Sequence, residues 1–170
     1  LSQESTEAYE AARATVAEYL GASDRRSVIF TAGTTASINL LASSLGESYF
    51  RPGDVILVSE MEHHSNLVPW QLIAQRKGLT VQKIPVRDDA SLDMEALPQL
   101  LQSPVRLVAV AHVSNVTGRV NPIREIAQMT HSAGALLLVD GAQGVKHMAP
   151  IDVEELGADF YAFSSHKIYG

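Results

Sequence analysis

The sequence contains no cysteine among its 170 residues. This absence excludes disulfide bonds, thiolate metal sites and a cysteine nucleophile within the chain itself. It also fits a reducing compartment, in which disulfides rarely persist. We therefore expect a cytoplasmic protein.

Basic residues and long apolar runs are scarce as well. The 13 Lys and Arg residues are outnumbered by 19 Asp and Glu residues, which gives a net charge of −6 at pH 7. A nucleic-acid-binding protein needs a basic stripe that neutralises phosphates, so we expect no nucleic-acid partner. Single basic residues still suffice to bind one small phosphate. Apolar stretches such as Ala135–Val139 are far shorter than the ~20 residues that span a bilayer, so we expect no membrane partner.

Short apolar strands alternate with helical patterns along the chain. The composition, with 46% hydrophobic and 19% charged residues, is that of a globular protein. The strands are predicted at Val28–Phe30, Val55–Val58, Thr80–Ile84, Leu107–Ala111, Ala135–Val139 and Phe160–Phe163. The helices are predicted at Ser5–Leu20, Ala36–Leu45, Leu67–Arg76, Asp93–Leu101, Pro122–Ser132 and, as a short turn, Val153–Leu156. This alternation predicts an α/β fold with a mostly parallel central sheet and helices on both faces.

Polar side chains follow five of the six predicted strands. In an open parallel sheet, ligands bind beyond the carboxyl ends of the strands. The residues at these ends include imidazole, amine and carboxylate groups, which a turn by itself does not require. The five segments are Gly33–Thr35, Glu60–His64, His112–Asn115, Asp140–Gln143 and Ser164–Lys167. We therefore expect one binding site along this edge.

Residues in two of these segments each allow a functional and an ordinary interpretation. Gly33, Thr34 and Thr35 open a helix, where converging N–H groups bind phosphate; alternatively, Thr34 or Thr35 is a simple N-cap. Asp140 either pairs with a protonated ring nitrogen or caps the turn that follows its strand. Gln143 either hydrogen-bonds a phenolic oxygen or faces solvent.

The histidines and the lysine are the other candidates. His63 and His64 are adjacent, so their side chains diverge, and without cysteine we expect no metal site. One of these histidines is instead predicted to stack on a flat cofactor. Lys167 follows an apolar strand and the polar segment Ser164–His166. Alone it is a solvated lysine, but together with the other strand ends it is predicted to bind a cofactor as a Schiff base.

Five segments resemble the cysteine desulfurases of the class V aminotransferase group, and most closely the branch that mobilises sulfur for iron–sulfur cluster assembly. They are GTTASINLLA, EMEHHSNLVPWQ, HVSNVTG, VDGAQG and DFYAFSSHKIYG, in this order. The resemblance covers essentially the whole chain. It implies the large domain of a fold-type-I enzyme that uses pyridoxal 5'-phosphate (PLP). It also implies L-cysteine as substrate, L-alanine as product, a sulfur-acceptor protein as partner, and a homodimer.

The resemblance assigns a role to each candidate residue. Lys167 would bind the cofactor covalently and later transfer protons, and His63 would stack on the pyridine ring and assist that transfer. Asp140 would bind the ring nitrogen, and Gln143 the phenolic oxygen. The phosphate would be held by Thr34, Thr35, Ser164 and His166. Asn115 would contact the substrate carboxylate or the ring oxygen.

The sequence departs from the family pattern at two positions and in its length. Ala32 stands where similar enzymes usually carry arginine, and Ser165 stands where they commonly carry glycine. Family members are much longer, so we expect residues 1–170 to be a truncated part of the PLP-binding large domain. The nucleophilic cysteine and the arginine that grips the substrate carboxylate would then lie beyond Gly170.

Two other functions remain open from the residues alone. The first is a different class V PLP enzyme, such as a transaminase, an epimerase or a kynureninase-like lyase. The second is a non-catalytic α/β binding domain without a cofactor. Visible absorbance separates the second from the enzymes, since a lysine-linked PLP colours the protein.

Because the chain has no cysteine, we predict that residues 1–170 alone do not turn over L-cysteine. The purified polypeptide, incubated with PLP and L-cysteine, should release neither sulfide nor persulfide. Release of either one would contradict the expectation that the nucleophile lies elsewhere.

Overall fold

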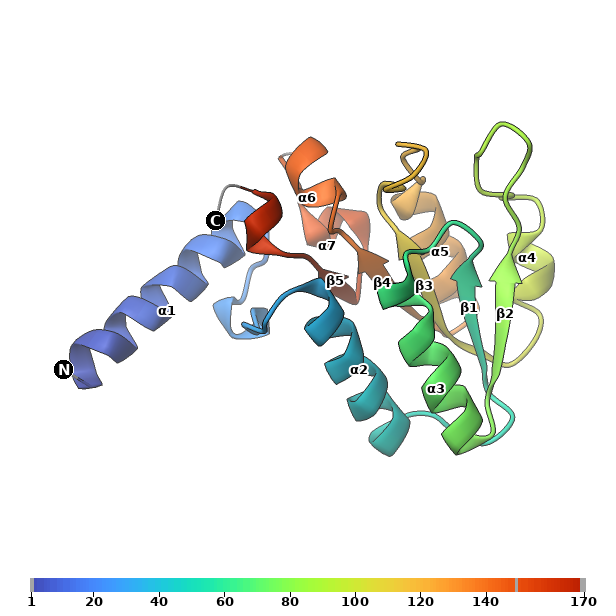
Figure 1. Ribbon diagram of the computed structural model, residues 1–170, viewed down its shortest axis with the longest axis horizontal. Helices are drawn as coiled ribbons and strands as arrows, with labels where there is room; N and C mark the ends of the chain where they lie inside the picture. Colours follow the sequence, from blue (N-terminus) through green and yellow to red (C-terminus); the bar gives the residue numbers. More distant parts are fainter. Residues whose placement is uncertain (1, 149, 169–170) are drawn as a thin grey trace.

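Within residues 2–148 and 150–168, which the computed structural model describes, five strands form one central sheet (Figure 1). The order across the sheet is β2-β1-β3-β4-β5, and all four pairings are parallel. The strands are β1 (Val55–Ser59), β2 (Thr80–Ile84), β3 (Val105–Ala111), β4 (Leu136–Asp140) and β5 (Phe160–Ala162). The predicted parallel sheet is therefore confirmed.

Helices cover both faces of the sheet, as the sequence predicts (Figure 1). One face carries α2 (Thr34–Ser48) and α3 (Val68–Lys77). The other face carries α4 (Leu97–Leu100), α5 (Ile123–Ser132) and α7 (Val153–Leu156). The remaining helical elements are α1 (Ser2–Tyr19), α6 (Gly144–His147) and the 3-10 turns η1 (Arg25–Ser27), η2 (His64–Asn66) and η3 (Ser165–Lys167). None of the described helices has both the length and the apolarity that crossing a membrane requires.

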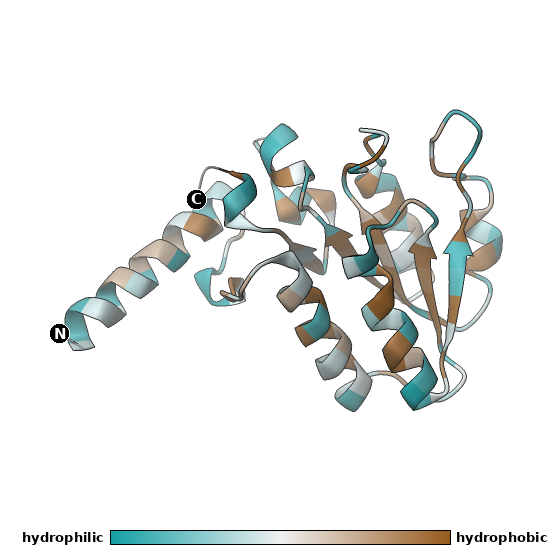
Figure 2. Cartoon of the chain, in the orientation of Figure 1, coloured by the Kyte–Doolittle hydropathy of each residue, from teal (hydrophilic) through white to brown (hydrophobic). Residues whose placement is uncertain are grey.

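The central strands are apolar throughout because both of their faces are covered. Successive strand residues point to opposite faces of a sheet. In β1, Val55 and Leu57 pack in the core beneath α5, whereas Ile56 and Val58 pack in the core beneath α2 and α3. Figure 2 shows the central strands in brown and the edge strand β2 partly in teal.

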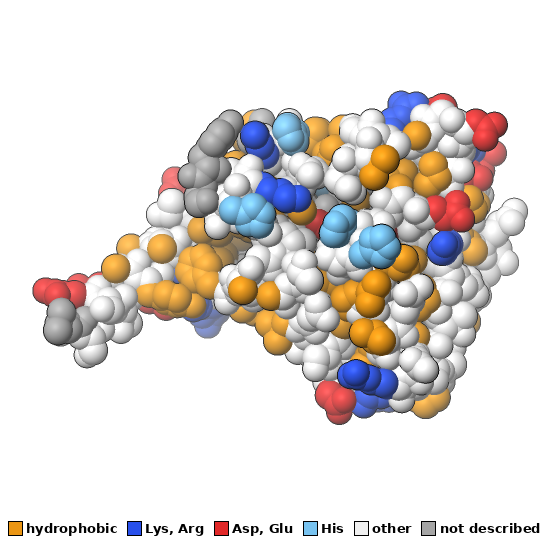
Figure 3. Space-filling view, in the orientation of Figure 1, with side chains coloured by type: hydrophobic (Ala, Val, Ile, Leu, Met, Phe, Trp, Pro, Cys, Tyr) orange, Lys and Arg blue, Asp and Glu red, His pale blue; other side chains and the backbone are white. Residues whose placement is uncertain are grey.

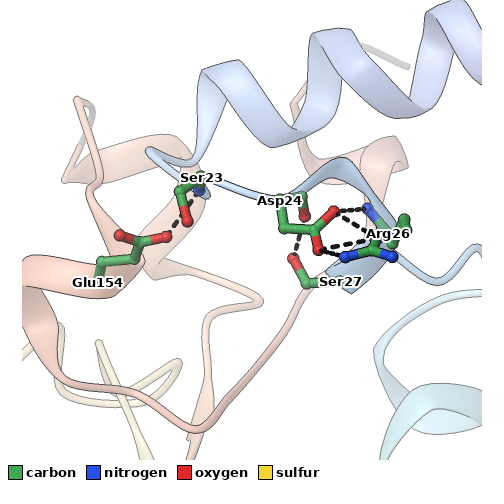
Figure 4. A network of polar contacts seen from close by, with 5 residues as sticks. All are labelled: Ser23, Asp24, Arg26, Ser27 and Glu154. Atoms are coloured by element: carbon green, nitrogen blue, oxygen red, sulfur yellow. Dashed lines mark hydrogen bonds and ion pairs between the residues drawn. The ribbon is translucent and has the colours of Figure 1, made fainter.

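Helix α1 extends away from the sheet, and the segment after it is fixed by polar contacts (Figure 1). The Ser23 N–H donates to Oε1 of Glu154 in α7 at 2.6 Å. The Asp24 carboxylate accepts hydrogen bonds from the Arg26 backbone and guanidinium, and the Asp24 carbonyl accepts one from Ser27 Oγ (Figure 4). The Ser23 contact joins this segment to α7, and the Asp24 contacts stabilise the turn that leads on to α2.

The predicted strand at Val28–Phe30 is wrong. This segment connects η1 to α2 without strand pairing, and the side chains of Ile29 and Phe30 are 68% and 42% exposed. A strand requires a neighbour that satisfies its backbone hydrogen bonds, and none of the described strands pairs with this segment. The β-branched residues Val28 and Ile29 favour a strand, but this preference stabilises a strand only where it packs in a sheet.

The other differences concern the ends of elements. α2 begins at Thr34 rather than at Ala36, and β4 includes Asp140. Within the predicted helix Asp93–Leu101, the α-helix is limited to Leu97–Leu100, with a proline in its first turn. Proline favours that position because its missing N–H is not needed there.

A core leucine and a surface leucine test this packing. Leu138 in β4 is fully buried, so Leu138→Ala should lower the free energy of unfolding by about 2–5 kcal/mol. Leu72 in α3 is 46% exposed, so Leu72→Ala should change it by less than about 0.5 kcal/mol. Urea unfolding of the two variants measures the difference, and equal losses would contradict the structure.

Candidate active site

A cavity of about 250 Å³ lies at the carboxyl ends of the strands. Its wall takes residues from the start of α2 and from the segments that follow β1, β3, β4 and β5. The lining includes the imidazoles of His63 and His166 and the amine of Lys167, and Figure 3 shows pale-blue histidine side chains gathered in this part of the molecule. All nine residues singled out from the sequence line the cavity: Thr34, Thr35, His63, Asn115, Asp140, Gln143, Ser164, His166 and Lys167.

The strand order explains why the cavity opens at this place. The chain leaves β1 through α3 toward β2, but leaves β3 through α5 toward β4 on the opposite face. The connections therefore diverge between β1 and β3, which creates a crevice at their carboxyl ends. The segments after these two strands carry His63 and Asn115.

The start of α2 is joined to the segment after β5. The Thr34 N–H donates to Ser164 Oγ at 2.8 Å, and the two side-chain oxygens lie 2.7 Å apart. Gly33 is the N-cap at φ 116°, and a Cβ there would lie 3.0 Å from Ser164 Oγ. Thr34 and Thr35 are inside the helix, so the interpretation of either as the N-cap is wrong. The Thr34 N–H is taken by Ser164, and no N-cap side chain satisfies the N–H groups that follow it, so these offer a site for an anion.

Asp140 is the last residue of β4 and is 5% exposed. Its Oδ1 accepts the Ala142 N–H at 2.9 Å, so the turn-capping interpretation holds for one oxygen. Among the described residues, Oδ2 has no hydrogen-bond partner. Burial raises the pKa of Asp140, while the Ala142 N–H and the charges of Lys167 and His63 partly lower it. The carboxylate is thus suited to a cationic ligand in the cavity.

His63 and His64 have different surroundings, as their adjacency predicts. Their ring centroids lie 6.2 Å apart with planes at 83°, and of the two only His63 lines the cavity. The Ser65 N–H donates to His63 Nδ1 at 3.1 Å, which puts the proton of the neutral ring on Nε2. Within the two described ranges, no three His, Asp or Glu side chains cluster as a metal site would require.

Lys167 ends the 3-10 turn η3 and is half-buried. Its backbone N–H donates to the Ser164 carbonyl at 3.2 Å, so the lysine and Ser164 belong to one turn. The lysine charge lowers the pKa of Asp140, in keeping with their shared cavity. Its environment is therefore not that of a fully solvated lysine.

Glu62, like Ser65 in the cavity wall, was not singled out from the sequence. Its carboxyl group is hydrogen-bonded to Ser59 Oγ, to Asn66 Nδ2 at 2.7 Å and to the Ala111 N–H at 2.8 Å. Burial raises its pKa to about 7, although these hydrogen bonds lower it in part. An acidic residue between a buried strand and His63 was the available signal, but the partners became visible only in the structure.

The chain belongs to the aminotransferase class-V family, which it matches over residues 1–170. It is 53% identical over all 170 residues to a cysteine desulfurase of Dickeya dadantii (strain 3937), and it covers 41% of that protein. The cysteine desulfurase CsdA (S-sulfonic acid form) from Escherichia coli has a similar structure. The TM-score is 0.92 at 45% identity, over 99% of this chain and 42% of that one.

A further solved structure is similar at lower identity. It is a mutant of C-DES with glycine covalently linked to the PLP cofactor, with a TM-score of 0.89 at 27% identity. The match covers 99% of this chain and 44% of that chain. These likenesses confirm the predicted fold and family, and the chain spans less than half the length of these relatives. Tyr169 and Gly170, at the end of the last motif, lie outside the described residues.

The raised pKa of Glu62 predicts a pH effect on stability. Between its usual pKa of 4.5 and about 7, the folded state binds more protons at Glu62 than the unfolded state does. The contribution of Glu62 to stability is therefore fully present below about pH 4.5 and is lost as the pH rises to about 7. Glu62→Gln should remove this part of the pH dependence. Urea unfolding at several pH values measures it, and parallel curves for wild type and variant would contradict the assignment.

Proposed function

We propose that residues 1–170 are the cofactor-binding part of a PLP-dependent cysteine desulfurase. The whole protein would convert L-cysteine to L-alanine and pass the sulfur to an acceptor. The observation that carries this proposal is the cavity, because the start of α2 and the ends of four strands bring nine predicted residues together in its wall. The names of relatives at 53% and 45% identity support the same reaction.

The start of α2 and its contact with Ser164 fit the phosphate group of PLP. A phosphate at this helix end would meet backbone N–H groups and the positive end of the helix dipole. Thr34, Thr35 and Ser164 add hydroxyl groups, and His166 adds an imidazole. Gly33 has no Cβ that would press against Ser164 Oγ at 3.0 Å, so the backbone can close tightly around the anion.

Asp140, Gln143 and His63 fit the ring of the cofactor. Oδ2 of Asp140, which has no partner in the described part of the chain, would accept a hydrogen bond from the protonated ring nitrogen and would stabilise its charge. Gln143 would donate to the phenolic oxygen. His63, oriented through Nδ1 by Ser65, would lie against the ring and would present its Nε2 proton. PLP supplies an electron sink when it is bound, and these residues would hold it in the charge state that this chemistry needs.

Lys167 and Asn115 complete the proposed set. The Lys167 amine would hold the cofactor covalently and, once released, would move a proton at the substrate Cα. Asn115, exposed on the loop after β3, would contact the substrate carboxylate or the ring oxygen. Transfer of the sulfur needs a cysteine thiolate, which residues 1–170 do not contain. That nucleophile and a carboxylate-binding arginine would come from the remainder of a longer protein.

The location, the oligomeric state and the sulfur acceptor of the enzyme are proposed from the family resemblance. The protein would be a cytoplasmic homodimer whose sulfur acceptor serves iron–sulfur cluster assembly. Another class V reaction would use the same cofactor contacts, so the deciding feature is a nucleophilic cysteine in the rest of the protein.

Substitution of Lys167 tests the proposal. The full-length protein should show the visible absorbance of lysine-bound PLP, and Lys167→Ala should abolish that band together with L-cysteine turnover. Lys83→Ala, on the exposed part of the edge strand β2, is the control and should keep both. An unchanged band in Lys167→Ala would contradict the role of this lysine. A wild-type protein that binds no PLP would contradict the function.

A further inference from the structure

The carboxyl group of Glu62 connects three segments beside the cavity. Its Oε1 is hydrogen-bonded to Ser59 Oγ at the end of β1 and to the Ala111 N–H at the end of β3. Its Oε2 accepts a hydrogen bond from Asn66 Nδ2 in η2. Since Ala111 pairs with Asp140 in the sheet, this network also adjoins the strand end that carries Asp140.

The hydrogen bonds of this network require an acceptor at both oxygens of Glu62. The Asn66 amide cannot turn over, because its Oδ1 accepts the Trp70 indole N–H at 3.0 Å. Its Nδ2 therefore points a donor at Oε2, while the Ala111 N–H points a donor at Oε1. Asn66 and Trp70 are both fully buried, so water does not replace a lost partner there. A carboxylate accepts at both oxygens, whereas glutamine of the same length accepts at one only.

The network fixes the backbone on both sides of His63. Glu62, the residue before His63, is bonded to Ser59 at the end of β1 and to Ala111 at the end of β3. Asn66, at the end of the turn after His63, is bonded to Trp70 in α3. The His63 ring is fixed in addition by its own hydrogen bonds to Ser65. With backbone and ring both held, the imidazole has a defined place in the cavity wall.

We propose that Glu62 is a positioning residue, whose two acceptor oxygens hold the turn between Ser59 and Asn66 so that His63 faces the bound cofactor. The inference rests on the proposed function, because it concerns the histidine that would lie against PLP. Glu62 itself does not line the cavity, so it acts through His63 and touches neither cofactor nor substrate. A change at Glu62 should therefore have no additional effect once His63 is removed.

A double-mutant cycle on the full-length holoenzyme tests this coupling. The four proteins are wild type, Glu62→Gln, His63→Ala and the double variant. Glu62→Gln places a donor opposite Asn66 Nδ2 or the Ala111 N–H, so the turn must shift. We expect kcat for L-cysteine to fall roughly 10- to 100-fold with little change in KM, since misplacement of a catalytic group acts on the chemical step. In the His63→Ala background, Glu62→Gln should lower kcat less than about twofold.

Two readouts are independent of turnover. The visible circular dichroism of bound PLP reports the asymmetry around the ring and should change in Glu62→Gln. A crystal structure of this variant should show the His63 ring displaced. Glu60→Gln is the matched control, because Glu60 follows the same strand but accepts a hydrogen bond from the Val86 N–H at the sheet edge. It should match wild type in kcat and in both readouts.

The outcomes separate this inference from the proposed function. A wild-type protein without bound PLP and without L-cysteine turnover overturns the function itself. An active wild type in which the losses from Glu62→Gln and His63→Ala add up overturns only the positioning role. If Glu62→Gln does not yield folded holoenzyme, Glu62→Asp replaces it, because the shorter side chain cannot reach both Asn66 and Ala111. Failure of both variants to fold contradicts the proposal, since Glu62 would then be required for the fold.

Discussion

The parallel pairing of β1, β3 and β4 is the constraint on which the site depends. Val58 pairs with Ala109, and Ala111 pairs with Asp140, so the three strands end along one edge of the sheet. Parallel strands point every connecting segment at their carboxyl ends to the same side. Groups separated by a hundred residues thus meet in one cavity. The apolar strand residues hold this register, because a shift by one residue would move each of them to the opposite face.

Two carboxyl groups lie at this edge beside otherwise apolar strands: Asp140 is buried, and Glu62 is partly buried. Burial raises the pKa of both Glu62 and Asp140, which shows that each ionised carboxylate is unfavourable there. Glu62 is compensated within the chain by three hydrogen bonds, whereas Asp140 keeps one oxygen without a partner among the described residues. Such an arrangement is typical of binding sites, where a ligand provides the missing partner.

The sequence was sufficient for the fold class and for nine of the residues that line the cavity, whereas Ser65, Ala111, Val113 and Ala142 were not singled out. Continuous apolar runs identified β1, β3 and β4, and the polar residues directly after them identified the edge. It failed at Val28–Phe30, because a strand depends on a neighbour that local pattern does not reveal. It also failed at Glu62, whose role depends on the Ala111 N–H, 49 residues away in sequence. The roles of the nine cavity residues remain predictions that rest on the family resemblance.

The most direct test of this account is a crystal structure of the full-length protein with PLP bound. We predict a covalent bond to Lys167 Nζ and a ring nitrogen within hydrogen-bond distance of Asp140. The phosphate should lie at the start of α2, against Thr34, Thr35 and Ser164. A cofactor bound outside this cavity, or one held in it with Asp140 turned away from the ring, would contradict the account.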